Sequence, residues 1–225
     1  VPYLIITALL VALVLFIKSA KLPEVTEGRS EEIDKNSKVD TVQRSIFSYP
    51  YLWFGVFAIF FYVGAEVIAI DYLVLYGKYV GLSQSISAYL GVFALIALVV
   101  GYLVGIILIP KYISQRRALI VQLLVSIILV IVAISTNAFV SIFAIIALSF
   151  THAIMWPAIW PLSIHSLGKY TKLGSAFLIM AIAGGALIPL IYGKLADNFN
   201  PQIAFSILFI SYFYILFFAT CGYKK

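Results

Sequence analysis

The chain is organised as long apolar stretches separated by short polar turns. A window of the length that crosses a hydrocarbon core finds seven such stretches. They cover residues 1–17, 49–76, 87–109, 119–134, 139–164, 175–192 and 203–220. None of them alternates with the period of two that a lipid-spanning strand requires. Helices satisfy every backbone polar group in lipid, so the pattern predicts an all-α integral membrane protein with seven transmembrane helices.

The one long polar stretch divides these helices unequally. We expect residues 1–18 to be the last helix of an amino-terminal bundle, 19–46 a cytoplasmic linker, and 47–225 a six-helix bundle. The first stretch begins without Met, a basic flank or a small-residue cleavage site, so it does not resemble a signal peptide. The order of one helix, a linker and six helices predicts the carboxyl-terminal fragment of a six-plus-six transporter.

Composition narrows the class of protein further. Hydrophobic types make up 64% of the 225 residues and charged types 11%, with a mean hydropathy of +1.10. These values exclude a soluble globular or a disordered chain. The single cysteine, Cys221, excludes an internal disulfide framework. Catalytic motifs such as His-Glu-x-x-His or Gly-x-Ser-x-Gly are absent from the sequence, so we expect no enzyme, no cofactor and no metal.

The net charge of +6 does not indicate nucleic acid, because the basic residues lie in the turns between apolar stretches. If the first stretch ends in the cytoplasm, thirteen of the fifteen Lys and Arg residues fall in inside loops, and only Lys78 and Lys194 fall outside. The positive-inside rule therefore predicts a multi-pass protein with a cytoplasmic carboxyl terminus. Its surroundings would be membrane lipid.

Ionisable residues within membrane helices are rare and usually face a cavity or a partner. Glu66 lies within the second stretch and shares a helical stripe with Tyr62, four residues earlier. Asp71, five residues after Glu66, would lie about 140° away on a regular helix and could instead reach the outer headgroups. We expect Tyr62 and Glu66 in a substrate cavity and Asp71 as a further candidate; an interhelical hydrogen bond is the alternative for Glu66.

The fifth stretch carries His152 and the run Met-Trp-Pro-Ala-Ile-Trp-Pro at 155–161. Trp156 and Trp160 are four residues apart and share a face, and the two prolines should bend the helix. A tryptophan face can pack against the apolar face of a sugar. His152, Trp156 and Trp160 are therefore candidate substrate-binding residues, although a structural histidine and simple packing are the open alternatives.

The sixth stretch contains Gly184 and Gly185, followed by Pro189. Small residues allow helices to approach closely, and a glycine pair near a proline is also typical of a hinge. We regard these three positions as candidate gating residues, with close packing as the alternative.

Longer runs carry a family resemblance. Residues 156–176, Trp-Pro-Ala-Ile-Trp-Pro-Leu-Ser-Ile-His-Ser-Leu-Gly-Lys-Tyr-Thr-Lys-Leu-Gly-Ser-Ala, continue into Phe-Leu-Ile-Met-Ala-Ile-Ala-Gly-Gly-Ala-Leu-Ile-Pro at 177–189. This run, with Phe-Phe-Tyr-Val-Gly-Ala-Glu-Val at 60–67 and the turn ending Ile-Pro-Lys-Tyr-Ile-Ser-Gln-Arg-Arg-Ala at 109–118, resembles the fucose/glucose/galactose:proton symporter family. That family is a branch of the major facilitator superfamily. The resemblance extends over nearly the whole chain.

The resemblance implies the carboxyl-terminal part of a twelve-helix major facilitator fold. It also implies uptake of a monosaccharide, a hexose or deoxyhexose, coupled to a cation across the bacterial inner membrane. The cation would be a proton, with sodium possible, and the family's proton-coupling carboxylates lie in the amino-terminal half. The run Ile-Asp-Tyr-Leu at 70–73 departs from the family and leaves an amino sugar such as N-acetylglucosamine open. A seven-helix receptor is the alternative of another class.

Overall fold

The computed structural model describes residues 2–19, 45–109 and 111–224. The chain divides into two compact units, residues 1–43 and 44–225, which we describe separately. In the first unit, α1 (Pro2–Ser19) is an apolar helix that ends with Lys18 in its last turn. Most of the expected linker 19–46 lies outside the described residues.

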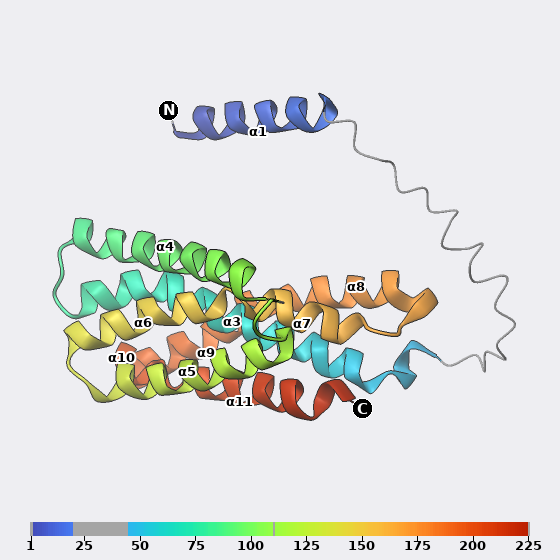
Figure 1. The fold of residues 1–225 in the computed structure, drawn as a ribbon. Coiled ribbons are helices and arrows are strands. Elements are labelled where there is room, and N and C mark those ends of the chain that lie inside the picture. Colours follow the sequence, from blue (N-terminus) through green and yellow to red (C-terminus); the bar gives the residue numbers. More distant parts are fainter. Residues whose placement is uncertain (1, 20–44, 110, 225) are drawn as a thin grey trace, which may run out of the picture. The chain divides into compact units, whose positions relative to one another are not determined.

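The second unit is a bundle of helices that run side by side (Figure 1). Within the described residues, six helical segments are long and apolar enough to cross a membrane, and they match the six stretches expected after the linker. The helices are α3 (Pro50–Tyr79), α4 (Gln84–Leu108), α5 (Gln115–Ser135), α6 (Ala138–His152), α7 (Met155–Ile164), α8 (Thr171–Met180), α9 (Gly184–Asn198), α10 (Pro201–Ala204) and α11 (Ile207–Thr220). The described part of the chain contains no strand. The prediction of an all-α membrane fold is confirmed.

Several helix starts follow directly from the local sequence. The side chains of Ser83, Asn137 and Asn200 each accept a hydrogen bond from a backbone N–H in the first turn of α4, α6 and α10. Such N-caps satisfy donors that have no partner inside the helix. Pro50 and Pro201 occupy first-turn positions, where the missing N–H of proline costs nothing. Turn residues between the apolar stretches therefore fix where the helices begin.

The longest helix, α3, lies at the centre of the bundle and packs against α4, α6, α7, α9 and α11. Its apolar residues are spread over every side of the helix, as expected for a helix surrounded by other helices. At the contact with α9, a side-chain carbon added to Gly184 would overlap the Phe60 carbonyl oxygen. One added to Gly64 would lie 2.5 Å from Ile188. Glycine at these two positions therefore allows the backbones to approach closely.

Polar side chains hold both ends of α5 against the last helical segment. At one end, Arg116 Nε donates to the Ala219 carbonyl oxygen at 2.8 Å, and its guanidinium lies 4.8 Å from the centre of the Tyr223 ring. At the other, Gln202 Nε2 donates to the carbonyl oxygens of Ala133 and Thr136, at 2.9 and 2.7 Å. These bonds satisfy carbonyls at helix ends that lack a partner within their own helix.

Candidate functional site

The middle of α3 presents a hydrogen-bonded pair of polar side chains. The Tyr62 hydroxyl donates to Glu66 Oε1 at 2.8 Å, as their spacing of one helical turn allows. Tyr62 is almost fully buried, whereas Glu66 is half-buried. The sequence analysis placed these two residues on one stripe, and the structure brings their functional groups into contact.

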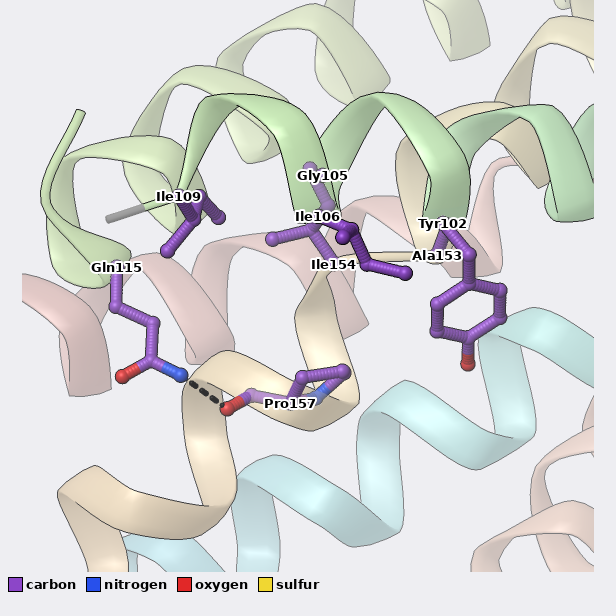
Figure 2. Close-up of a pocket in the computed structure, with 8 residues that line it drawn as sticks. All are labelled: Tyr102, Gly105, Ile106, Ile109, Gln115, Ala153, Ile154 and Pro157. Atoms are coloured by element: carbon purple, nitrogen blue, oxygen red, sulfur yellow. Dashed lines mark hydrogen bonds between the residues drawn. The ribbon is translucent and has the colours of Figure 1, made fainter. Parts of the chain in front are cut away.

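A third polar group, which the sequence analysis did not identify, comes from α4. Tyr102 interacts electrostatically with both Tyr62 and Glu66. Figure 2 shows its ring extending from α4 toward α3. A tyrosine in the middle of an apolar stretch was the available signal, but its partners lie on a different helix.

His152 ends α6 and is completely buried. Its Nε2 lies 2.7 Å from the Tyr212 hydroxyl of α11, and its Nδ1 has no hydrogen-bond partner among the described residues. The His152 ring meets the Tyr62 ring edge-on, with centroids 6.1 Å apart. The contact with Tyr212 favours a structural role for His152 over a substrate-binding role. His152 also packs against the Tyr62 ring.

The two tryptophans of α7 stack on one another, with ring centroids 5.7 Å apart and planes inclined by 23°. Trp156 also contacts the Tyr62 ring at a centroid distance of 6.1 Å. An open hollow of about 390 Å³ lies over this pair. Its lining residues are Trp156, Pro157, Trp160, Pro161 and Ile179. The indoles are half-buried and thus form an apolar platform beside the Tyr62–Glu66 pair.

The fifth membrane segment is interrupted at Ala153 and Ile154, between α6 and α7. Pro157 explains the position of this break. In a regular helix its ring would clash with the carbonyl group of the residue four positions earlier, Ala153. Pro161 likewise has no N–H to donate to the Pro157 carbonyl oxygen. Instead, Gln115 Nε2 of α5 donates to that oxygen at 2.6 Å (Figure 2). The segment is thus interrupted near the two prolines, where the sequence predicted a bend, and a neighbouring helix satisfies the freed carbonyl.

A second cavity, of about 180 Å³, lies beside this break (Figure 2). It is lined by Tyr102, Gly105, Ile106, Ile109, Gln115, Ala153, Ile154 and Pro157. The walls of this cavity are mostly apolar, and the polar side chains that line it are those of Tyr102 and Gln115. Tyr102 therefore links this cavity to the Tyr62–Glu66 pair.

Four of the candidate residues lie apart from this group. Asp71 is exposed, and α3 is a continuous helix, so the structure does not bring Asp71 to the face of Glu66. Gly184 and Gly185 begin α9 directly after the 3₁₀ turn Ala181–Ala183, where α9 packs on α3. The Pro189 carbonyl oxygen accepts a bond of 3.5 Å from the Tyr72 hydroxyl. The glycines thus lie at a packed contact and at a change of helix type.

These groups are of the kinds that a ligand with polar edges and one apolar face would need. Tyr62, Tyr102 and Glu66 offer hydroxyl and carboxyl groups, and the stacked indoles offer a flat apolar surface. Small-molecule sites combine apolar walls with a few placed polar groups in this way. The described residues contain no group of three His, Cys, Asp or Glu side chains that could hold a metal ion.

The fold is that of a multi-pass membrane protein with six membrane-length helical segments in its second unit. The chain belongs to the Major Facilitator Superfamily, whose family description it matches over residues 1–188. The chain is 37% identical to a putative glucose/galactose transporter of Helicobacter pylori, over 100% of this chain and 54% of that protein. It is 33% identical to a glucose/galactose transporter of Brucella abortus, over 100% of this chain and 53% of that protein. The L-fucose-proton symporter of Escherichia coli is 26% identical, over 93% of this chain and 50% of that protein.

The solved structures give the same fold. An outward-facing structure of the transporter FucP superposes with a TM-score of 0.78 at 24% identity, over 98% of this chain and 54% of that one. The chain spans about half the length of the curated relatives it matches. The predicted resemblance to the sugar symporter branch of the superfamily is confirmed.

Proposed function

We propose that the chain is the carboxyl-terminal part of a secondary active transporter for a hexose or deoxyhexose. The relatives named as glucose/galactose transporters and as L-fucose-proton symporters support this assignment. Membership in a superfamily of transporters favours it over a receptor of seven helices. The transport would be coupled to protons and would take place across a bacterial inner membrane, with the carboxyl terminus in the cytoplasm.

One observation carries the substrate class. Trp156, which stacks on Trp160, contacts the Tyr62 ring, and the Tyr62 hydroxyl donates a hydrogen bond to Glu66. A pyranose ring has an apolar face of C–H groups and a rim of hydroxyls. The ring would lie on the indoles, while its hydroxyls exchange hydrogen bonds with Tyr62 and Glu66. His152 supports this wall through its contact with the Tyr62 ring.

The other wall of the binding site would come from the amino-terminal bundle. In transporters built of two related halves, substrate binds near the middle of the membrane between them. The two halves then rock around the bound sugar, so that the site opens to one side at a time. Gly184 and Gly185 lie where helix type changes within one membrane segment, and Pro189 lies inside α9. We assign these three residues the bending that this motion requires. Differential binding of sugar and proton to the two states would drive the exchange between them.

Uptake by the complete transporter, reconstituted in liposomes, tests this proposal. Labelled glucose, galactose, fucose and N-acetylglucosamine would be offered separately, first with an imposed pH gradient and then with a sodium gradient. We expect glucose, galactose or fucose to accumulate under the pH gradient alone. Accumulation driven only by sodium would contradict proton coupling. A correctly inserted protein that accumulates none of glucose, galactose and fucose would overturn the hexose assignment, and uptake of N-acetylglucosamine would replace it with an amino sugar.

A further inference from the structure

One end of the bundle carries a concentration of positive charge. The helices α3, α5 and α8 begin at this end, and α4, α7 and α11 end there (Figure 1). Contacts between the helix ends agree with this arrangement, since Arg116 donates to the Ala219 carbonyl oxygen and the Tyr51 hydroxyl donates to the His165 carbonyl oxygen at 2.6 Å. The Lys and Arg residues that the structure describes at this end are Lys111, Arg116, Arg117, Lys169, Lys172 and Lys224.

Acidic residues of the bundle do not balance this charge. Residues 44–225 contain three acids, of which Glu66 lies in the middle of α3. The other two, Asp71 and Asp197, lie toward the opposite end, where α3 and α9 finish. The same end holds Lys78 and Lys194. The opposite end thus combines two bases with two acids, whereas the first end has bases alone among residues 44–225.

The cavity of about 180 Å³ beside the break between α6 and α7 adjoins the turn between α4 and α5 (Figure 2). Ile109, which lines the cavity, directly follows the last residue of α4, and Lys111 comes two residues later. Gln115, which also lines it, is the first residue of α5, and Arg117 comes two residues later. Both Lys111 and Arg117 are exposed. Each side of the turn therefore places a cation close in sequence to the cavity wall.

The interior of this cavity suits hydrocarbon. Its wall is mostly apolar, and the amide nitrogen of Gln115 is already bonded to the Pro157 carbonyl oxygen. Ile106 lines the cavity and is 74% exposed, so the cavity reaches the outer surface of the bundle. Its volume is below the roughly 300–1,000 Å³ of sites for drug-sized ligands. The cavity can therefore hold a segment of a hydrocarbon chain.

We propose that the cavity and the adjoining turn bind an anionic phospholipid, with a segment of one acyl chain in the cavity and the headgroup phosphate beside Lys111 and Arg117. An apolar hollow next to uncompensated cations fits a molecule that joins a hydrocarbon chain to an anion. Basic pockets between membrane helices bind acidic lipid headgroups in this way.

Tyr112 supports a position of this turn at the level of the lipid headgroups. Its ring is 66% exposed, and the ring centre lies 5.3 Å from Lys111 Nζ. Tyrosine is enriched at membrane–water interfaces, because its ring is apolar and its hydroxyl is polar. The lipid site requires a membrane protein, but it does not depend on which solute the protein transports.

Lipid binding to the complete protein, freed of lipid in detergent, tests the headgroup contacts. Native mass spectrometry would measure the affinity of the first bound lipid for dioleoylphosphatidylglycerol, which is anionic, and for dioleoylphosphatidylcholine, which has the same chains but no net charge. In the double variant Lys111→Gln/Arg117→Gln, we expect the affinity for phosphatidylglycerol to fall about fivefold for each charge removed. Its affinity for phosphatidylcholine should not change. The matched variant Lys78→Gln/Lys194→Gln, at the opposite end, should bind both lipids like the unsubstituted protein.

A second pair of variants tests the acyl chain. Ile106→Trp places an indole at the mouth of the cavity, and we expect it to lower the affinity for both lipids. Ile107 is 65% exposed on the same helix and does not line the cavity, so Ile107→Trp should leave both affinities unchanged. Thermal unfolding without lipid would show that each variant is folded.

Three results would overturn the lipid site. An unchanged affinity for phosphatidylglycerol in Lys111→Gln/Arg117→Gln would remove the headgroup contacts. Equal lipid affinities in Ile106→Trp and Ile107→Trp would remove the acyl chain from the cavity. If inorganic phosphate competes with phosphatidylglycerol as strongly as the lipid competes with itself, the turn binds a soluble anion instead.

Discussion

At the scale of single residues, His152 shows how a partner on another helix changes the meaning of a polar side chain. In the sequence it is a lone histidine in an apolar stretch, open to a substrate or a structural role. In the structure its Nε2 is 2.7 Å from the Tyr212 hydroxyl, and both side chains are buried. A buried polar group that loses its partner is costly, because no water replaces it. We therefore expect the His152–Tyr212 hydrogen bond to contribute mainly to the stability of the fold and not to sugar binding.

Replacing Tyr212 by phenylalanine tests this interpretation. Tyr212→Phe keeps the ring but removes the hydroxyl, which would leave both nitrogens of His152 unpaired among the described residues. We expect a loss of stability of about 1–3 kcal/mol, seen as a lower thermal unfolding temperature in detergent. The matched variant Tyr89→Phe removes an exposed hydroxyl on α4 and should have no such effect. Equal unfolding temperatures for the two variants would show that the His152–Tyr212 bond contributes little.

At the scale of helices, the prolines and glycines of the fifth and sixth segments determine where regular structure is interrupted. Pro157 accounts for the break before α7, and Pro161 frees a carbonyl that Gln115 of α5 satisfies. In the sixth segment, the 3₁₀ turn Ala181–Ala183 precedes Gly184, which meets the Phe60 backbone of α3. The carbonyl freed by Pro161 thus has a hydrogen-bond partner on a neighbouring helix, as membrane interiors require, and Gly184 lies at a close contact between helices.

The bond from Gln115 to Pro157 can be tested by a double-mutant cycle. Gln115→Ala should lower stability by about 1 kcal/mol, because the Pro157 carbonyl loses its donor. In a Pro161→Ala background, the new backbone N–H at position 161 can donate to that carbonyl, and Gln115→Ala should then cost less. Thermal unfolding of the four proteins measures this coupling. Gln122→Ala, in the same helix, is the control. Additive costs across the cycle would mean that Gln115 does not compensate for Pro161.

Two glycines of α9 offer a matched comparison. At Gly184 an added methyl group would overlap the Phe60 carbonyl oxygen, whereas at Gly193 it would meet nothing within 4 Å. We expect Gly184→Ala to force α9 away from α3 and to reduce both folded yield and transport. Gly193→Ala should be neutral or should stabilise the helix by up to about 1 kcal/mol. If Gly184→Ala folds and transports as well as Gly193→Ala, the close contact between α3 and α9 is not required.

At the scale of the whole molecule, the sequence predicts features that lie within a single helix, but it does not predict contacts between side chains on different helices. Span positions follow from apolar length, and the Tyr62–Glu66 contact follows from a spacing of four residues. The roles of Tyr102 and Gln115 could not be predicted, because their partners lie on other helices and no period in the sequence relates them. These pairs form only when the helices pack together, and the hydrophobic pattern of the sequence does not specify how the helices pack.

The central claim is that the face formed by Trp156, Trp160 and Ile179 is a sugar site, and protection from chemical labelling tests it most directly. Ile179 is 56% exposed at this face, so Ile179→Cys would introduce a reactive thiol beside the indoles. In the complete transporter, the transported sugar should slow alkylation of this thiol. Alkylation of the exposed native Cys221, measured in the same sample, should not change. An equal rate at position 179 with and without saturating sugar would contradict the account.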